Sequence, residues 1–344
     1  MSATRPRAHE PGSAPFFEDL HVGLLERSAP PVTLTDGMAA VHRSIVGDRL
    51  RLALDRKLAR DVLGLREAIA HPALVWDVAI GQSTLLTGRV IANLFYRGLV
   101  LARMPLIGDT LTTSSEVVAL RQNTTRAGRP ASGLAALRVR TNDQHGAPVL
   151  DFWRCAMLPL RDPAGQTGHG DSFDEIPSEL APEALTAAVS SWRLDQLPQL
   201  EGSRTARLAP GMSWRPHGGD VVSGASELAR LTLNVAAVHH DRHEQPGGSR
   251  LVYGGHTIGL AAAQATRVLP EIVTIVGWHS CEHLGPVHEG DTLHSELSLE
   301  RIAAIGGGGA LAHLRSRVRA SGSAGKADGD AAEVLDWRFV AVLA

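Results

Sequence analysis

Two stretches of the chain are apolar on every side of a helix, and each lies near runs of alternating apolar and polar residues. Residues 74–86 come just after Pro72, and proline is favoured in the first turn of a helix because its missing N–H costs least there. Residues 257–268 come after Gly254 and Gly255 and are rich in alanine, isoleucine and leucine. A helix without a polar face must be buried. We therefore expect each helix to be wrapped by a sheet.

Period-two alternation, which is typical of half-buried strands, predicts the strands of both halves of the chain. In the first half the run 112–121 alternates, and strands are predicted at 136–141 and 149–158. In the second half the predicted strands are 272–278, 292–302, 310–319 and 334–342.

The two halves also repeat each other in order. Gly-Asp-Thr-Leu occurs at residues 108–111 and again, 182 residues later, at 290–293. Val-Leu-Asp occurs at residues 149–151 and again, 185 residues later, at 334–336. Two repeats at nearly the same separation indicate an internal duplication.

Residues 161–182 are rich in Gly, Asp, Pro and Ser, with little apolar periodicity, which is typical of a linker. We expect a loose turn at the glycine run 306–309 and a hairpin loop at 321–330. The predicted organisation is a flexible polar arm at 1–15, an N-terminal repeat at 16–160, a linker at 161–185 and a C-terminal repeat at 186–344.

Composition and charge exclude several classes of protein. The 34 basic and 36 acidic residues nearly balance, so there is no electrostatic reason to expect binding to nucleic acid or to an anionic membrane. No stretch approaches the roughly 20 apolar residues that a membrane helix needs. The N-terminal residues lack the apolar core of a signal peptide. Cys155 and Cys281 fit neither a disulfide framework nor a zinc site. These features predict a cytoplasmic protein without a metal.

Several segments resemble the MaoC-like dehydratases and hydratases. The resemblance begins with residues 16–23 and includes the segments 105–111 and 286–293, each of which ends in Gly-Asp-Thr-Leu. Within the family, the mesaconyl-CoA hydratase (β-methylmalyl-CoA dehydratase) branch is the most similar, through residues 91–94, 120–123, 234–239 and 250–256. The fold that the resemblance implies is an α+β double hotdog, with two antiparallel sheets each wrapped around a central helix.

The resemblance also implies an acid–base pair, an Asp and a His five residues apart, before the buried helix. Asn234 and His239 have this spacing, so Asn stands where the family has Asp. An imidazole, with an ordinary pKa of about 6.5, can take a proton from water and return one to carbon. We predict that His239 is the base and that Asn234 holds the water by its carbonyl oxygen. Activity should then fall along a single limb as His239 is protonated below neutral pH.

The thioester oxygen needs hydrogen-bond donors, because negative charge develops on it during the reaction. Backbone N–H groups at a helix N-terminus can supply them. Gly255 is the predicted donor, because a residue without a Cβ lets the thioester approach the backbone closely. The alternative is that Gly254 and Gly255 only form a tight turn into the helix.

Five further residues are predicted to bind substrate: Gly254, His256, Tyr253, Arg250 and Asn93. His256 could instead cap the helix. The Tyr253 hydroxyl could donate either to a substrate carboxylate or to a buried carbonyl.

The first half lacks the catalytic pair, because Ala53 stands five residues after Asp48. We expect this half to be catalytically silent and to supply part of the binding surface. Arg97 and Arg121 are candidates to face the acyl chain or the CoA phosphates. Any arginine that binds a free carboxylate would do so as a fork, and the sequence does not identify which one.

These observations predict a hydratase that adds water reversibly to a short branched enoyl-CoA with a second carboxylate. The resemblance alone implies mesaconyl-CoA and β-methylmalyl-CoA as the pair, with CoA as part of the substrate and no dissociable cofactor or metal. Three alternatives stay open: an (R)-specific hydratase of simple enoyl-CoA, a hotdog thioesterase and a non-catalytic acyl-CoA-binding protein. Exposed sheet edges often pair two protomers, so a homodimer or higher homo-oligomer is expected.

Overall fold

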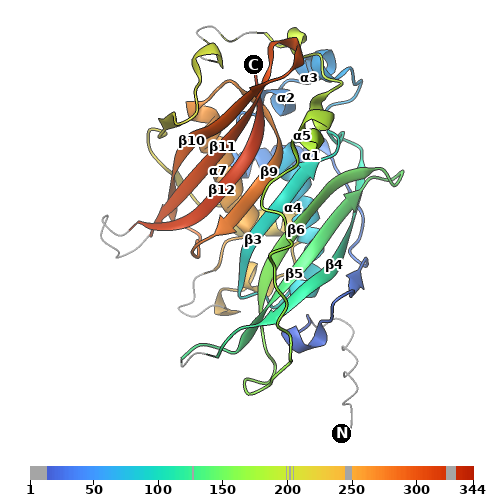
Figure 1. The fold of residues 1–344 in the computed structure, drawn as a ribbon, viewed down its shortest axis with the longest axis vertical. Helices are drawn as coiled ribbons and strands as arrows, with labels where there is room; N and C mark the ends of the chain where they lie inside the picture. The colour runs from blue at the N-terminus through green and yellow to red at the C-terminus, as the bar shows by residue number, and fades with distance from the viewer. Residues whose placement is uncertain are drawn as a thin grey trace.

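The computed structural model describes residues 14–125, 128–198, 200, 203, 205–244, 250–322 and 331–344. Within them the chain forms one antiparallel sheet of 12 strands (Figure 1). The strands of the first half are β1 (Leu25–Glu26), β2 (Val32–Thr33), β3 (Ala92–Leu101), β4 (Thr110–Gln122), β5 (Ser132–Asn142) and β6 (Pro148–Pro159). Those of the second half are β7 (Ser213–Trp214), β8 (Asp220–Val221), β9 (Ile272–His283), β10 (Thr292–Ala304), β11 (Ala310–Ser321) and β12 (Ala332–Leu343).

Seven α-helices accompany the sheet in the described residues: α1 (Asp36–Val46), α2 (Arg51–Leu54), α3 (Arg56–Leu63), α4 (Pro72–Gln82), α5 (Pro182–Val189), α6 (Ala225–Leu231) and α7 (Gly254–Val268). The short 3-10 helix η2 (Ser83–Thr87) directly follows α4, and another, η5 (Ala237–His239), lies between α6 and α7. None of the described helices is long and apolar enough to cross a membrane.

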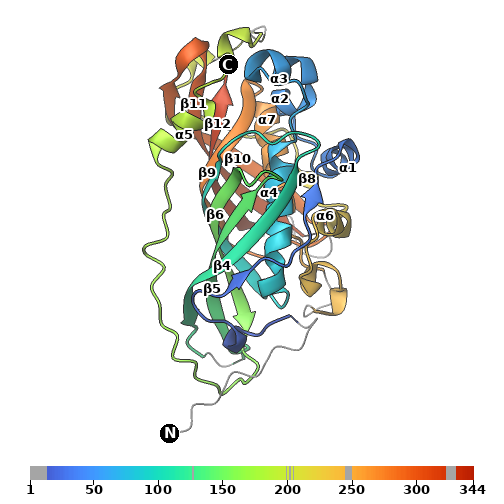
Figure 2. The same ribbon diagram turned by 90° about the vertical axis from the view of Figure 1, so that its right-hand side faces the viewer.

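The two apolar helices predicted from the sequence are α4 and α7, and both are buried against the same face of the sheet (Figure 2). Every residue of α4 is buried. Its first turn is capped by His71, whose Nδ1 accepts a hydrogen bond from the Ala73 N–H at 3.0 Å. The prediction of two buried central helices is therefore confirmed.

The sheets of the two halves join edge to edge, because β3 pairs with β9. Read outward from this junction, the strand order is β3-β6-β5-β4 in one half and β9-β12-β11-β10 in the other, as the internal duplication requires. Trp76 of α4 packs edge-on against Trp278 of β9, with 4.8 Å between the ring centroids. The two hotdogs thus share one core and one continuous sheet.

Strand β3 was missed by period-two alternation because both of its faces are covered. On one face lie the central helices, and on the other runs the segment 161–181 that connects the halves (Figure 2). Phe173 and Ile176 of this segment pack in a cluster with Phe95 and Cys155 on the outer face of the sheet. The predicted linker is therefore a strap that packs against the sheet.

The outer edges of the sheet are partly covered within the chain. Strands β1 and β2 pair with β4 at one edge, and β7 and β8 pair with β10 at the other. Each of these four strands has only two residues, whereas β4 and β10 have 13 each, and the homodimer stays a prediction. Residues 306–308 form a 3-10 turn, as expected. Residues 1–13 of the predicted arm and 323–330 of the predicted hairpin loop lie outside the described residues.

Candidate active site

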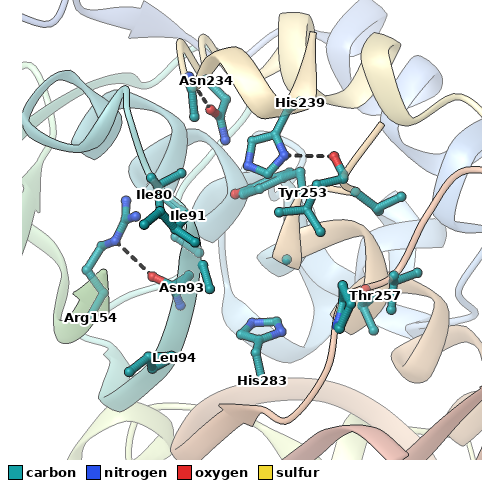
Figure 3. Close-up of a pocket in the computed structure, with 18 of the residues that line it drawn as sticks. Ile80, Ile91, Asn93, Leu94, Arg154, Asn234, His239, Tyr253, Thr257 and His283 are labelled. Carbon is teal, nitrogen blue, oxygen red and sulfur yellow. Dashed lines mark hydrogen bonds between the residues drawn. The ribbon is translucent and has the colours of Figure 1, made fainter. Parts of the chain in front are cut away.

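A cavity of about 370 Å³ lies between the two halves. The first half supplies one wall from α4, η2, β3 and β6, and the second half supplies the other from η5, the start of α7 and the end of β9 (Figure 3). None of the described residues that line it is an aspartate or glutamate. The expectation that the first half provides part of a binding surface agrees with this arrangement.

His239 lies on the wall formed by the second half, at the end of η5. Its Nδ1 is 2.9 Å from the backbone oxygen of Leu251. A carbonyl only accepts, so Nδ1 carries the proton and Nε2 carries the free lone pair. Burial lowers the pKa of His239 to about 4, although the bond to Leu251 opposes this shift. The ring is therefore neutral at physiological pH and is able to act as a base through Nε2.

Asn234 lines the same cavity, five residues before His239, and its side chain is held by the local turn. Its Oδ1 accepts a hydrogen bond from the Ala236 N–H at 3.0 Å. The backbone oxygen of Asn234 accepts another from Nε2 of His240 at 2.6 Å. One lone pair of Oδ1 is used by the bond from Ala236 and a second one is left, so the expectation that Asn234 holds water by its carbonyl oxygen stays a prediction. The amide nitrogen Nδ2 has no partner among the described residues and is also free to donate to a ligand.

The first turn of α7 divides its residues between the cavity and the core. Gly254 lines the cavity, and a Cβ there would lie 2.8 Å from the ring of His283. Gly255 does not line it, and a Cβ there would lie 2.1 Å from Oδ1 of Asp77 in α4. The reason given for glycine at 255 is therefore wrong, because its absent side chain makes room for helix α4 and not for a thioester. The backbone N–H groups of both glycines have no partner among the described residues and stay available.

The structure decides between the two roles considered for Tyr253 and places His256 outside the cavity. The Tyr253 ring lines the cavity, but its hydroxyl donates to the backbone oxygen of Asp77 at 3.1 Å, so of the two roles considered it takes the buried carbonyl. His256 is fully buried outside the cavity wall, with neither ring nitrogen bonded to a described residue. Burial lowers the pKa of His256 to about 4. The prediction that His256 contacts the substrate is therefore wrong, because its ring does not reach the cavity.

The predicted arginines lie outside the cavity, whereas Asn93 is part of it. Arg250 forms an ion pair with Glu289 at 2.5 Å. Arg97 stacks over Phe95 at 4.0 Å and Arg121 over Phe173 at 4.6 Å, both on the outer face with the strap. Arg97 and Arg121 therefore do not line the cavity proposed for the acyl chain, and their contact with the CoA phosphates stays a prediction. Asn93 of β3 lines the cavity.

Two cavity residues were missed by the sequence reasoning. Arg154 of β6 is 2% exposed; its Nε donates to Oδ1 of Asn93 at 3.2 Å and its Nη1 to Oγ of Ser83 at 2.7 Å. His283, at the end of β9, has an Nε2 without a partner among the described residues, and burial lowers its pKa to about 4. Alternation in β6 could have found Arg154, because the even-numbered positions from Phe152 onward point into the core.

Comparisons with known proteins point to one group. The β-methylmalyl-CoA dehydratase of Chloroflexus aurantiacus is 30% identical over 324 residues, which cover 89% of this chain and 88% of that protein. The mesaconyl-CoA hydratase of Cereibacter sphaeroides is 29% identical over 303 residues, 86% of this chain and 87% of that protein. No family model matches the chain.

Two solved structures share the fold over nearly the whole chain. A Mycobacterium tuberculosis protein described as having a double hotdog fold is 49% identical, with a TM-score of 0.86 over 96% of this chain and 98% of that one. A MaoC domain dehydratase from Chloroflexus aurantiacus is 27% identical, with a TM-score of 0.77 over 98% of this chain and 99% of that one. The predicted double hotdog fold is confirmed.

Proposed function

The chain belongs to the MaoC-like hydratases and dehydratases, in the branch of β-methylmalyl-CoA dehydratase and mesaconyl-CoA hydratase, and from that premise we propose that it reversibly hydrates an enoyl-CoA thioester. The favoured substrate is mesaconyl-CoA, and the product is β-methylmalyl-CoA. The observation that carries the proposal is the neutral, buried His239, which presents an unprotonated Nε2 to the cavity beside the amide of Asn234.

His239 and Asn234 together can bind and activate one water. Nδ2 of Asn234 donates to the water oxygen, and Nε2 of His239 accepts a proton from the same water. The oxygen then bonds to the β carbon, while the electrons of the double bond move toward the thioester. The imidazolium returns its proton to the α carbon, so water is consumed and no redox step occurs.

The negative charge that develops on the thioester oxygen requires donors at the start of α7. The free N–H groups of Gly254 and Gly255 lie at the positive end of a helix of 15 residues. Gly254 is on the cavity wall, so the thioester can approach its backbone closely. We assign the oxyanion contact to these two amides, with Gly254 as the residue that gives access.

Two alternatives have less support. A hotdog thioesterase usually uses a carboxylate near the thioester, and none is present among the described residues that line the cavity. A non-catalytic acyl-CoA-binding protein would have no need of a neutral imidazole in the cavity. A hydratase of simple enoyl-CoA would use the same mechanism and would differ from the proposed function only in the acyl group of its substrate.

A substrate panel tests the proposal. Purified protein is mixed with mesaconyl-CoA and with crotonyl-CoA, and the loss of ultraviolet absorbance of the conjugated thioester is followed. Hydration should be seen with at least one of them and should release no thiol. Binding of both without turnover would support the non-catalytic alternative, and release of free CoA would support a thioesterase.

Location, assembly and cofactor use belong to the same proposal. We place the protein in the cytoplasm, which agrees with two free, buried cysteines. We retain a homo-oligomer as a prediction, to be measured by light scattering after size-exclusion chromatography. The reaction as written needs no metal or dissociable cofactor, and an assay in the presence of a chelator tests this.

A further inference from the structure

We infer that Arg154 binds a carboxylate on the acyl group, and that it thereby restricts the enzyme to acyl-CoA substrates that carry a second, free carboxylate. The inference rests on the proposed hydratase function and adds to it the residue that selects the substrate. Its basis is a buried guanidinium in the cavity wall whose position in the fold does not require an arginine.

The duplication provides an internal control for what the fold needs at this position. In the first half, Arg154 of β6 lies opposite Leu137 of β5 and Tyr96 of β3. In the second half, the equivalent residue of β12 is Phe339, which lies opposite Leu314 of β11 and Trp278 of β9. An ion pair fixes the alignment, because Arg138–Asp151 of the first half recurs as Arg315–Asp336 in the second.

The two inward-facing positions are thus apolar in one half and polar in the other. Phe339 and Trp278 are fully buried in the core, where aromatic rings satisfy the packing. Tyr96 and Arg154 occupy the same positions and line the cavity. The hotdog core therefore folds with aromatic residues at both sites, and polar groups at positions 96 and 154 serve the cavity.

The charge of Arg154 has no counter-charge in the described part of the protein. The side chain is almost completely buried and makes no ion pair with a described carboxylate. Its two hydrogen bonds go to neutral oxygens of Asn93 and Ser83, which orient the guanidinium and leave Nη2 unused among the described residues. A buried charge is costly without a partner, so an anionic ligand is the natural complement.

Arg154 is also placed near the reacting end of the substrate. Its positive charge lowers the pKa of both His239 and His283, in addition to the larger effect of burial, so it acts on two residues of the opposite wall. Figure 3 shows Arg154 and Asn93 on the wall formed by the first half, across the cavity from His239. A carboxylate attached to the β carbon would thus lie between the arginine and the water held by the catalytic pair. A guanidinium can bind it through two parallel hydrogen bonds.

A matched pair of substrates isolates the carboxylate. In (E)-2-methyl-2-butenoyl-CoA a methyl group replaces the carboxylate of mesaconyl-CoA, and the rest of the molecule is the same. The wild-type enzyme should prefer mesaconyl-CoA by at least about 100-fold in kcat/KM, because a site that binds a polar group is left unsatisfied by an analogue that lacks it.

Variants then assign the preference to Arg154. Arg154→Gln should lose most of the activity on mesaconyl-CoA and change little on the methyl analogue, and Arg154→Lys should give an intermediate preference. Arg138→Gln is the matched control, because Arg138 lies on the adjacent strand, faces outward and pairs with Asp151. It should keep the wild-type preference.

The outcomes separate this inference from the proposed function. If wild type hydrates both substrates equally, or Arg154→Gln reduces both equally, Arg154 does not select the carboxylate, although the enzyme is still a hydratase. If neither substrate is hydrated, the proposed function fails, and calorimetry with saturated methylsuccinyl-CoA and 2-methylbutanoyl-CoA still tests Arg154. Equal binding of these two compounds by the wild type overturns the inference, and this test needs no variant. A preference for the carboxylate that persists in both Arg154→Lys and Arg154→Gln also overturns it.

Discussion

Replacing His239 by glutamine removes the base and leaves most of its surroundings in place. The amide of the introduced glutamine can still donate toward the Leu251 carbonyl that His239 binds at 2.9 Å, but it cannot accept a proton from water. Loss of a general acid–base group typically reduces the rate by about 10²- to 10⁴-fold. We expect His239→Gln to lower kcat by this factor with a small change in KM, since the thioester is held by other groups.

The pH profile tests the same residue without a mutation. Burial lowers the pKa of His239 to about 4, so at pH 5 roughly ten unprotonated rings are present for each protonated one. The kcat/KM of the wild type should therefore stay level from pH 8 to pH 5 and fall below that, with a midpoint near 4. The sequence, which could not reveal the burial of the ring, predicted a fall just below neutral pH.

Both measurements use the ultraviolet absorbance of the conjugated thioester. The control variant is His243→Gln, since His243 is exposed and lies only four residues from His239. Samples held at low pH are returned to pH 7 and assayed again, so that unfolding is not mistaken for titration. The reasoning would be refuted by wild-type turnover in His239→Gln, or by a reversible acid limb centred near 6.5.

Four further substitutions test the residues around the base. Asn234→Asp keeps the acceptor for the Ala236 N–H and places a negative charge beside His239. A negative charge raises the pKa of a nearby histidine, so kcat should stay measurable and the acid limb should move up by about one pH unit or more. An unchanged midpoint would count against contact between the two side chains. Gly254→Ala should reduce kcat in a folded protein, whereas Gly255→Ala should lower the free energy of unfolding by about 1–3 kcal/mol. Activity assays and urea titrations measure the two effects. A loss of stability in Gly254→Ala and a loss of kcat in Gly255→Ala would contradict the placement of Gly254 at the cavity and Gly255 against α4. Between pH 6.5 and about 4 the buried His256 is neutral in the folded protein and protonated in the unfolded chain, so the free energy of unfolding falls as pH decreases through this window. His256→Leu should reduce the slope of the free energy of unfolding against pH by about 1.4 kcal/mol per pH unit. An unchanged slope would contradict the buried neutral ring.

Much of the fold could be predicted from the sequence because its periodicities reflect one-sided or complete burial. Helices α4 and α7 are apolar on all sides, and strands with one covered face alternate, so both signals are local. Strand β3 carries no such signal, since the central helices cover one face and the strap at 161–181 covers the other. The strap is distant from β3 in sequence, so no local pattern of residues in β3 predicts that it covers this face.

The site could be predicted only where sequence spacing determines geometry. The five-residue spacing brings Asn234 and His239 to one cavity, because both lie in a single tight turn. The same reasoning fails at Gly255 and His256, since successive residues of a helix point about 100° apart and only Gly254 and Thr257 share the cavity face. Arg154 comes from the other half, so its position depends on how β3 joins the two sheets.

The difference between the two halves gives a structural reason to expect the first half to be catalytically silent. In the first half, Asp48 bonds Nε2 of His71 at 2.7 Å, and Nδ1 of the same ring accepts the N–H of Ala73 in the first turn of α4. This side chain occupies the N-terminus of the helix, where a thioester oxygen would bind. In the second half the residue before the helix is Tyr253, whose side chain does not cap α7 and bonds instead to Asp77 of α4. The amides of α7 are thereby left free, so the same structural element caps a helix in one hotdog and can stabilise an oxyanion in the other.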